Sequence, residues 1–392
     1  MISYEIWIII LWTGAFLTLH SYIFFPLFLK AITKNKSLSD YKKYNVGNNL
    51  PFVSIVMAVH NEERVIANKI ESVFNSNYPT NKIEFLIGSD CSTDATNEIL
   101  EKLTKKYPIK LFNYSQRTGK VKIINDLVQL ASHDIIISTD AKAFFLSDTI
   151  YQLITYLKDE RVGATGGYLL NKVTDKTGIS IQENKYMDRE MDIKYWETLY
   201  CGCPVGLYGA MYAIKKEYFV SVPENMFVDD FYITMKIYEQ GKKAIFNSKA
   251  QAVENVPNAI SEEFRRKVRI AIGNYQNLKA FAHIFLLHPF SKLGFCFFSH
   301  KVLRWKVPFF MIFAGIALLF LYPYSQFYKL LGIGYLLFLT IPILDKIFIS
   351  VGIHLKALRF ITHFIVMNLA LLVGFIKFLK GADKAIWQPS RR

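Results

Sequence analysis

The sequence predicts an α/β domain with a mostly parallel central sheet, joined at both ends to helices that cross a membrane. Apolar, β-branched runs alternate with helix-length segments in the first half of residues 51–280, which is the order of βαβ units. Several of these runs end abruptly in polar residues, as buried parallel strands do at their carboxyl ends. Finally, 52% of the 392 residues are hydrophobic, a share too high for a wholly soluble chain.

Residues 1–30 are predicted to form an N-terminal transmembrane helix. Positions 6–29 are almost free of charge, and roughly 20 apolar residues suffice to cross a hydrocarbon core. Lysines gather in the linker that follows, residues 31–50, so this side should face the cytoplasm. A retained anchor is preferred to a cleaved signal peptide, because no basic residue precedes the apolar run and no small-x-small cleavage site follows it.

The domain of residues 51–280 is expected to alternate strands and helices. The strands are expected over 52–59, 83–89, 109–114 and 134–139. The helices between them are expected over 62–75, 93–107 and 120–131. The second half is less regular, with helices expected over 179–199 and 230–240 and a glycine-rich turn over 201–209.

Residues 305–380 are predicted to hold about three C-terminal transmembrane helices. Their apolar stretches are 307–322, 330–344 and 360–378. Pro342 and Asp345 interrupt the middle one, which therefore fits a short span, a re-entrant segment or part of a longer kinked helix.

The segments that flank these helices are also rich in charge. Residues 281–304 mix histidines and a lysine with many aromatic residues, which suits a helix lying in the membrane interface. Residues 381–392 form a basic tail. Three spans would place this tail outside, whereas its positive charges favour the cytoplasmic side.

The net charge of +15 would suit nucleic acid, but the basic residues flank membrane segments or stand among acidic ones. Anionic lipid and diphosphate are therefore the preferred partners, and no nucleic acid is expected. Only Cys201 and Cys203 of the four cysteines are close together, which gives neither a disulfide framework nor a zinc spacing. A reduced cytoplasmic domain follows. His60 is likewise assigned to packing rather than to a metal.

Two carboxylates follow predicted strands. Asp90 comes after the second strand and Asp140 after the fourth, so both should reach the same edge of a parallel sheet. A carboxylate there can accept hydrogen bonds from a base or a ribose. Either residue could instead serve a turn, but two at one edge favour a ligand site.

Asp229 and Asp230 precede the predicted helix over 230–240. They could complement the helix dipole. Paired carboxylates also repel, which raises one proton affinity and makes a plausible general base for a sugar hydroxyl. The residues alone leave both readings open.

Two basic segments could meet a diphosphate. The cluster over 265–269 supplies charge neutralisation for a leaving group, and a membrane-facing patch is the alternative. Gly119 and Lys120 open a predicted helix after Arg117, where backbone N–H groups and a cation could also bind phosphate.

In order and spacing, seven short motifs resemble the membrane-bound inverting family 2 glycosyltransferases, a broad group that includes cellulose, chitin and hyaluronan synthases. The motifs are AVHNE at 58–62, SDCSTD at 89–94, GK at 119–120 with Asn125, STDA at 138–141, GA at 209–210, VDD at 228–230 and RKVR at 266–269. The resemblance covers roughly residues 50 to 280. It implies a GT-A fold that binds a nucleotide sugar, usually a UDP-sugar, with Mg²⁺ or Mn²⁺ on the diphosphate.

The resemblance also implies roles for individual residues. Asp230 would be the general base beside Asp229, while Arg269 and Arg266 would stabilise the departing diphosphate. The donor nucleotide would lie against Ala58, His60, Glu62, Asp90 and Lys120. Asp140 would be the first acid of the DxD-type metal element, and Gly209 and Ala210 would lie on the acceptor side.

The sequence departs from the family pattern at two places. Lys142 stands where a second acid would complete the metal element, and an ammonium group cannot ligate a cation. Residues 266–270 read RKVRI instead of the Gln-x-x-Arg-Trp of processive synthases. The first departure bears on metal use and the second on processive polymerisation.

These observations predict an integral membrane protein of the bacterial inner or cell membrane, active in cell-envelope polysaccharide biosynthesis, with a cytoplasmic catalytic domain. Its expected reaction is transfer of a sugar from a nucleotide sugar to a lipid-linked or polysaccharide acceptor. A processive exopolysaccharide synthase is the alternative among enzymes. A non-catalytic nucleotide-sugar-binding membrane subunit is the alternative outside them, motivated by Lys142.

Overall fold

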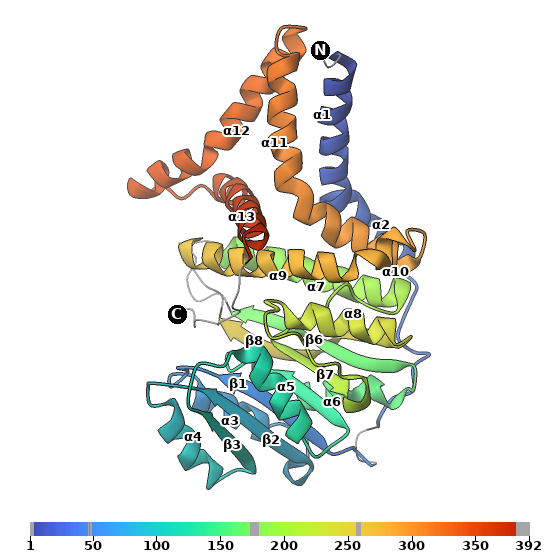
Figure 1. The fold of residues 1–392 in the computed structure, drawn as a ribbon, viewed down its shortest axis with the longest axis vertical. Coiled ribbons are helices and arrows are strands. Elements are labelled where there is room, and N and C mark those ends of the chain that lie inside the picture. The colour runs from blue at the N-terminus through green and yellow to red at the C-terminus, as the bar shows by residue number, and fades with distance from the viewer. Residues whose placement is uncertain (1–3, 46, 48, 173–179, 256–259, 382–392) are drawn as a thin grey trace. The chain divides into compact units, whose positions relative to one another are not determined.

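The computed structural model describes residues 4–45, 47, 49–172, 180–255 and 260–381 (Figure 1). These residues group into two compact units. The α/β unit comprises residues 32–172 and 187–255 of the described chain, and the helical unit comprises residues 4–31, 180–186 and 260–381.

The α/β unit is built on one eight-stranded sheet with the order β3-β2-β1-β4-β7-β6-β8-β5 (Figure 1). The strands are β1 (Val53–Val59), β2 (Ile83–Asp90), β3 (Ile109–Tyr114), β4 (Ile135–Thr139), β5 (Phe144–Phe145), β6 (Val162–Lys172), β7 (Met211–Lys215) and β8 (Lys243–Asn255). Strands β1 to β4 pair in parallel, as do β6 and β8. Strand β7 is antiparallel to both neighbours, and β5 is antiparallel to β8. The four strands expected from the sequence are β1 to β4, so that part of the prediction is confirmed.

The central strands are apolar because helices cover the sheet on both faces. Val53, Ile55 and Met57 of β1 are fully buried, and they share one core with Ile66 and Ile70 of the helix that follows. This continuous apolar pattern is typical of a parallel strand between two layers.

The helices of this unit are α3 (Ile66–Phe74), α4 (Thr96–Thr104), α5 (Lys120–Leu130), α6 (Thr149–Ile154) and α8 (Asp229–Glu239), with the main part of α7 (Ser180–Cys201). Short 3₁₀ turns are η2 (Thr80–Lys82), η3 (Thr155–Lys158) and η4 (Lys216–Tyr218). Helices α3 and α4 begin three to four residues later than the sequence predicts, at Ile66 and Thr96 rather than at 62 and 93. In the turns before them, the backbone N–H groups of Glu62 and Glu63 donate hydrogen bonds to the side chains of Thr96 and Asp94.

Helix α5 packs very closely on β2. A Cβ atom on Gly88 would lie 2.3 Å from the Cγ2 of Ile123. Gly119, just before α5, has φ of 93°, in the left-handed region that favours glycine. This turn delivers Lys120 to the first position of α5 at the carboxyl edge of the sheet.

The helical unit contains α1 (Tyr4–Leu19), the π-helical η1 (His20–Phe24), α2 (Phe25–Thr33), α9 (Ile260–Leu286), α10 (Lys292–Cys296), the π-helical η5 (Phe297–Val302), α11 (Leu303–Leu321), α12 (Gln326–Ser350) and α13 (Lys356–Leu379). Four continuous helical stretches of the described chain are long and apolar enough to cross a membrane: 4–33, 292–321, 326–350 and 356–379. Apolar helices at both ends of the chain agree with the sequence prediction, whereas their orientation stays a prediction.

The middle C-terminal stretch is one long helix, because α12 continues through Pro342 to Ser350. Asp345 on this helix is buried and lies 3.0 Å from the Nε of Arg359 on α13. A charge in apolar surroundings requires such a partner, and this pair ties the two helices together.

Residues 281–304 do not form a separate helix. Helix α9 continues to Leu286, with non-helical backbone at Phe281, and the stretch that begins at Lys292 runs on into α11. Part of this segment therefore belongs to a helix of spanning length, and its position in the membrane interface stays a prediction.

Candidate active site

The carboxyl ends of β1, β2 and β4 place the candidate site residues at one edge of the sheet. These three strands are parallel neighbours, so the chain leaves each of them on the same side. Ala58 lies in β1 opposite Gly88 of β2. Asp90 ends β2, and Asp140 directly follows β4.

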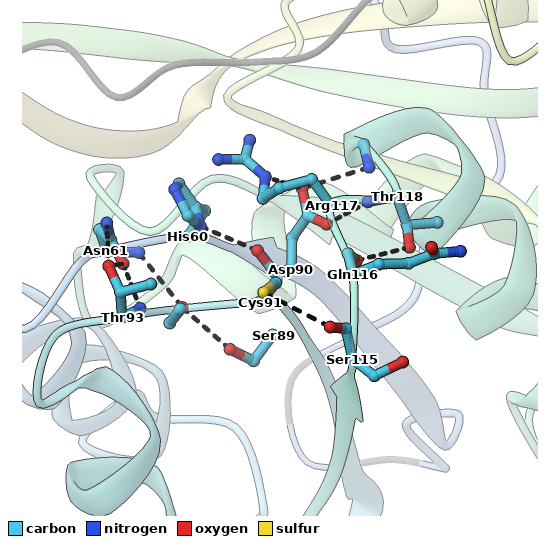
Figure 2. A network of polar contacts seen from close by, with 12 residues as sticks. His60, Asn61, Ser89, Asp90, Cys91, Thr93, Ser115, Gln116, Arg117 and Thr118 are labelled. Atoms are coloured by element: carbon cyan, nitrogen blue, oxygen red, sulfur yellow. Dashed lines mark hydrogen bonds and ion pairs between the residues drawn. The ribbon is translucent and has the colours of Figure 1, made fainter.

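Asp90 holds the loop that leads into α5. Its carboxylate is buried and accepts hydrogen bonds from the backbone N–H of Thr118 (2.6 Å) and of Gly119 (3.2 Å). It also forms an ion pair with the Nε of Arg117 at 3.1 Å (Figure 2). The carboxylate predicted to bind the base thus also orders the turn that presents Lys120.

His60, which directly follows β1, contacts the same residue. Its Nδ1 lies 2.8 Å from the carbonyl oxygen of Asp90 (Figure 2). Burial, and after it the Arg117 guanidinium, lower the pKa of His60, so its imidazole is neutral at pH 7. This supports the packing role that the residues themselves suggested, and a contact of His60 with the nucleotide stays a prediction.

The turns after β1 and β2 are tied together by side chains. Asn61 has φ of 53°, and its Oδ1 accepts a hydrogen bond from the backbone N–H of Thr93 at 2.8 Å (Figure 2). Asp94 accepts hydrogen bonds from the N–H groups of Glu63 and Thr96. Asp94 therefore serves the start of α4.

Lys120 and Asp140 form a partly exposed ion pair. Their Nζ and Oδ1 are 2.7 Å apart, and the Asp140 side chain remains 44% exposed. Burial alone would lower the pKa of Lys120, but the carboxylates of Asp140 and Asp229 raise it above its usual value. The edge of the sheet thus holds a permanent cation next to an accessible carboxylate.

Lys142 lies beside Glu62. Its Nζ is 3.5 Å from the Oε1 of this buried glutamate. The residue that replaces the second acid of the metal element is thus paired with a carboxylate of the predicted donor side, which reduces its repulsion of a cation.

A cation site made by protein groups alone is not present in the described part of the chain. No group of three or more His, Cys, Asp or Glu residues occurs there that could hold a metal ion. Cations that arrive on a diphosphate need only one or two carboxylates besides phosphate oxygens. Asp140, with its exposed oxygen, fits that smaller requirement.

Asp230 stands in the first turn of α8 against a glycine. Burial, and then the neighbouring Asp229 carboxylate, raise the pKa of Asp230 to about 6. A Cβ atom on Gly209 would lie 3.1 Å from the Asp230 Oδ2. A carboxyl group that titrates near neutral pH is suited to accept a proton from a hydroxyl group.

Direct contacts connect the three predicted acids. Asp90 orders the turn before Lys120, and Lys120 pairs with Asp140. The N–H of Asp140 donates to the carbonyl of Ala210 at 3.0 Å, and the preceding Gly209 lies next to Asp230, where a Cβ atom would come within 3.1 Å of the carboxylate. One continuous set of residues therefore links the predicted donor, metal and acceptor positions.

Arg266 and Arg269 lie on α9, in the helical unit. Arg266 forms ion pairs at 2.8 Å with Glu263 and with Glu183, both of which are buried. Arg266 is thus used within its own unit, and the proposed action of both arginines on the leaving group stays a prediction.

Several residues of the site were missed because nothing in the sequence marks them. Lys69 and Lys194 are lysines with less than a tenth of their surface exposed, and Tyr212 is equally enclosed. Lysine is rarely buried, so a lone lysine on a helix is read as a surface residue. Arg117, in contrast, was named from the sequence, because it precedes Gly119 and Lys120.

Residues 54–213 match the family described as Glycosyl transferase family 2, so the α/β unit carries a family 2 glycosyltransferase domain. A beta-monoglucosyldiacylglycerol synthase of Nostoc sp. is 37% identical over 127 residues, which are 32% of this chain and 27% of that protein. A poly-beta-1,6-N-acetyl-D-glucosamine synthase of Staphylococcus aureus is 25% identical over 273 residues, 65% of each chain. The matched parts thus cover about a quarter and just under two thirds of these relatives.

Among solved structures, a mannosyltransferase from Pyrobaculum calidifontis in complex with GDP-Man and Mn²⁺ has the same fold. Its TM-score is 0.71 at 20% identity, covering 95% of this chain and 100% of the other. The mixed, mostly parallel sheet is therefore the GT-A type that the resemblance predicted.

Proposed function

We propose that the protein is a membrane-anchored inverting glycosyltransferase that moves a sugar from a nucleotide sugar to a lipid or glycan acceptor at the cytoplasmic face. UDP-sugars are the first donors to test. The observation that carries the proposal is Asp230, a half-buried carboxyl group with a pKa raised to about 6, connected through Gly209 and Ala210 to the Lys120–Asp140 pair.

In the proposed reaction, Asp230 accepts the proton of an acceptor hydroxyl as its oxygen attacks the anomeric carbon. The bond from that carbon to the donor diphosphate breaks on the opposite face, and the diphosphate keeps the electron pair, so the configuration inverts. Lys120 contributes positive charge where negative charge develops on the leaving group. Ala58, His60, Glu62 and Asp90 would line the nucleotide.

A divalent cation, when bound to the diphosphate, supplies further charge neutralisation. Asp140 is the residue that would hold it, because its oxygen is accessible. Gly209 and Ala210 would lie next to the acceptor, since Gly209 contacts the base.

Attachment to the membrane is supported by the four apolar helical stretches. Lys30 lies in the last turn of the first of these helical stretches, and Lys34 and Lys36 follow it closely, which favours a cytoplasmic α/β unit. Fusing a reporter that is active only in the cytoplasm to a loop of the α/β unit tests this orientation.

The central experiment incubates membranes that contain the protein with a panel of labelled nucleotide sugars, with Mn²⁺ or with EDTA. Transfer of label from one donor to lipid or polymer is the expected result. If donors bind and none is transferred or hydrolysed, the non-catalytic subunit suggested by Lys142 replaces the enzyme.

A processive synthase is the second candidate, and it is favoured by the longer of the two sequence matches, to the poly-beta-1,6-N-acetyl-D-glucosamine synthase. Product length separates the two. Excess donor gives products extended by one sugar if transfer is single, and long chains if the enzyme is processive.

A further inference from the structure

Lys194 on α7 is a buried lysine for which the proposed reaction has no use. Only 5% of its surface is exposed. Burying an ammonium group costs several kcal/mol unless its surroundings compensate, so a buried lysine calls for an explanation.

The Lys194 ammonium group holds the loop that precedes β7. Its Nζ donates hydrogen bonds to the carbonyl oxygens of Gly206 and, at 3.4 Å, of Leu207. The backbone N–H of Leu207 donates in turn to the Oγ1 of Thr234 at 2.9 Å, and Thr234 donates to the carbonyl of Asp230 at 2.6 Å. The loop is thus fixed between α7 and the start of α8.

This loop has no spare room next to the proposed base. A Cβ atom on Gly206 would lie 2.8 Å from the Phe231 ring, and one on Gly209 would lie 3.1 Å from the Asp230 carboxylate. Small displacements of the loop therefore change what surrounds Asp230.

Lys194 also acts on Asp230 through its charge. The groups that face Asp230 are Asp229 on the same helix, Lys194 on α7, Lys120 on α5 and Tyr212 on β7. Asp229 favours the protonated carboxyl group, while the two lysines favour the carboxylate. Besides donating hydrogen bonds to the two loop carbonyls, the Lys194 ammonium group thus acts on Asp230 through its positive charge.

We propose that Lys194 is a positioning residue for the base: its ammonium group holds the 206–209 loop against Asp230 and is the buried counter-charge of the Asp229–Asp230 pair. This inference rests on the proposed function. It adds a residue that touches neither substrate nor cofactor and that sets the pH range in which the base works.

The test compares the pH dependence of kcat/KM for sugar transfer in the wild type, Lys194→Gln and Lys194→Arg, all as full-length protein in detergent. Gln can still donate to the loop carbonyls but carries no charge. The acid limb of the profile, the pH range in which kcat/KM falls as Asp230 becomes protonated, should therefore move from near pH 6 to higher pH by roughly one pH unit. Activity should then fall about threefold at pH 6.5 and little at pH 8.5. Arg keeps the charge and should keep the limb near its wild-type position.

Lys69→Gln is the matched control. Lys69 is also a fully buried lysine, but it binds Thr139 and the carbonyl of Ala143, in the turn around Asp140. This variant is expected to change turnover without moving the acid limb. A Lys194→Gln limb at the wild-type position overturns the inference, and so does an equal shift in Lys69→Gln.

If Lys194→Gln does not fold, the double variant Asp229→Asn with Lys194→Gln removes one charge of each sign. Its limb should lie at higher pH than that of Asp229→Asn alone, and equal limbs contradict the inference. Absence of any transfer by the wild type contradicts the proposed function itself. Transfer by the wild type together with an unshifted acid limb in Lys194→Gln contradicts only the role of Lys194.

Discussion

The α/β unit and the helical unit both contain paired acidic and basic side chains, but the acidic side chains differ in how far they are exposed. At the sheet edge, Asp140 pairs with Lys120 and still has 44% of its side chain exposed. In the helical unit, Glu183 is 1% exposed and has three partners, Arg266, Lys267 and His363. An accessible carboxylate can still bind a ligand, whereas an enclosed one holds helices together. The exposure that a paired carboxylate keeps, rather than the ion pair itself, distinguishes a candidate binding site from a buried ion pair that only joins helices.

The largest effect should come from Asp230→Asn, which removes the proposed base of the α/β unit. Transfer should fall by about 10²–10⁴-fold because an amide cannot accept the proton, while donor binding is retained. Steady-state rates and donor titration measure the two quantities. Asp126→Asn, which removes an acid paired with Lys122 at 2.6 Å on α5, is the control and should stay close to wild type.

Glu183→Ala should have the next largest effect, on stability rather than on chemistry. It leaves Arg266, Lys267 and His363 without their shared acid and should cost about 3–5 kcal/mol of unfolding free energy. Thermal unfolding in detergent measures the loss. The same change at Glu262, in the first turn of α9, should cost no more than about 1 kcal/mol. Equal losses at the two positions would remove the contrast between enclosed and accessible acids.

The same glutamate predicts a pH dependence of stability. Burial alone would raise the pKa of Glu183, but Lys267, His363 and Arg266 lower it well below its usual range. A depressed pKa means that the stabilisation is complete at neutral pH and decreases as the pH falls below about 4.3. Glu183→Ala should therefore unfold with a weaker dependence on acid than the wild type.

Activity should respond to pH in a different range. The pKa of Asp230 is raised to about 6, and the base works only as a carboxylate. Below that value kcat/KM should fall by about tenfold for each pH unit, while the fold is still intact. Circular dichroism alongside the rate profile separates the two events, and a loss of activity that coincides with unfolding would contradict the assignment.

The smallest effect is expected from Lys142→Asp, which adds a second acid near Asp140. It replaces a cation by an oxygen ligand and should lower the Mn²⁺ concentration for half-maximal activity by roughly three- to tenfold. A rate profile against Mn²⁺ measures this change. No change would indicate that Lys142 faces Glu62 in the working enzyme as well, away from any cation.

Strand ends were predictable from the sequence, and contacts between distant residues were not. The β-branched runs of β1, β2 and β4 mark buried strands, so Asp90 and Asp140 could be placed at one edge before the fold was known. Strand β6 escaped notice because Gly166 and Gly167 interrupt its pattern, and its place depends on pairing with β7 and β8.

The ion pairs of Glu183 show the second limit. Its partners Arg266 and His363 lie 83 and 180 residues further along the chain. The sequence showed the basic cluster over 265–269 and suggested a diphosphate or a membrane surface for it. Helix packing decides which acidic side chain pairs with each basic one, and the local sequence does not encode that packing.

The pairing of Lys120 with Asp140 and of Lys142 with Glu62 has a consequence for how fast an anionic substrate arrives. Each lysine stands beside a charge of opposite sign, so these four side chains together present little net potential at a distance. Capture of a donor should therefore depend weakly on ionic strength. Discrimination between donors should arise after encounter, when the two lysines exchange their carboxylate partners for the donor at close range.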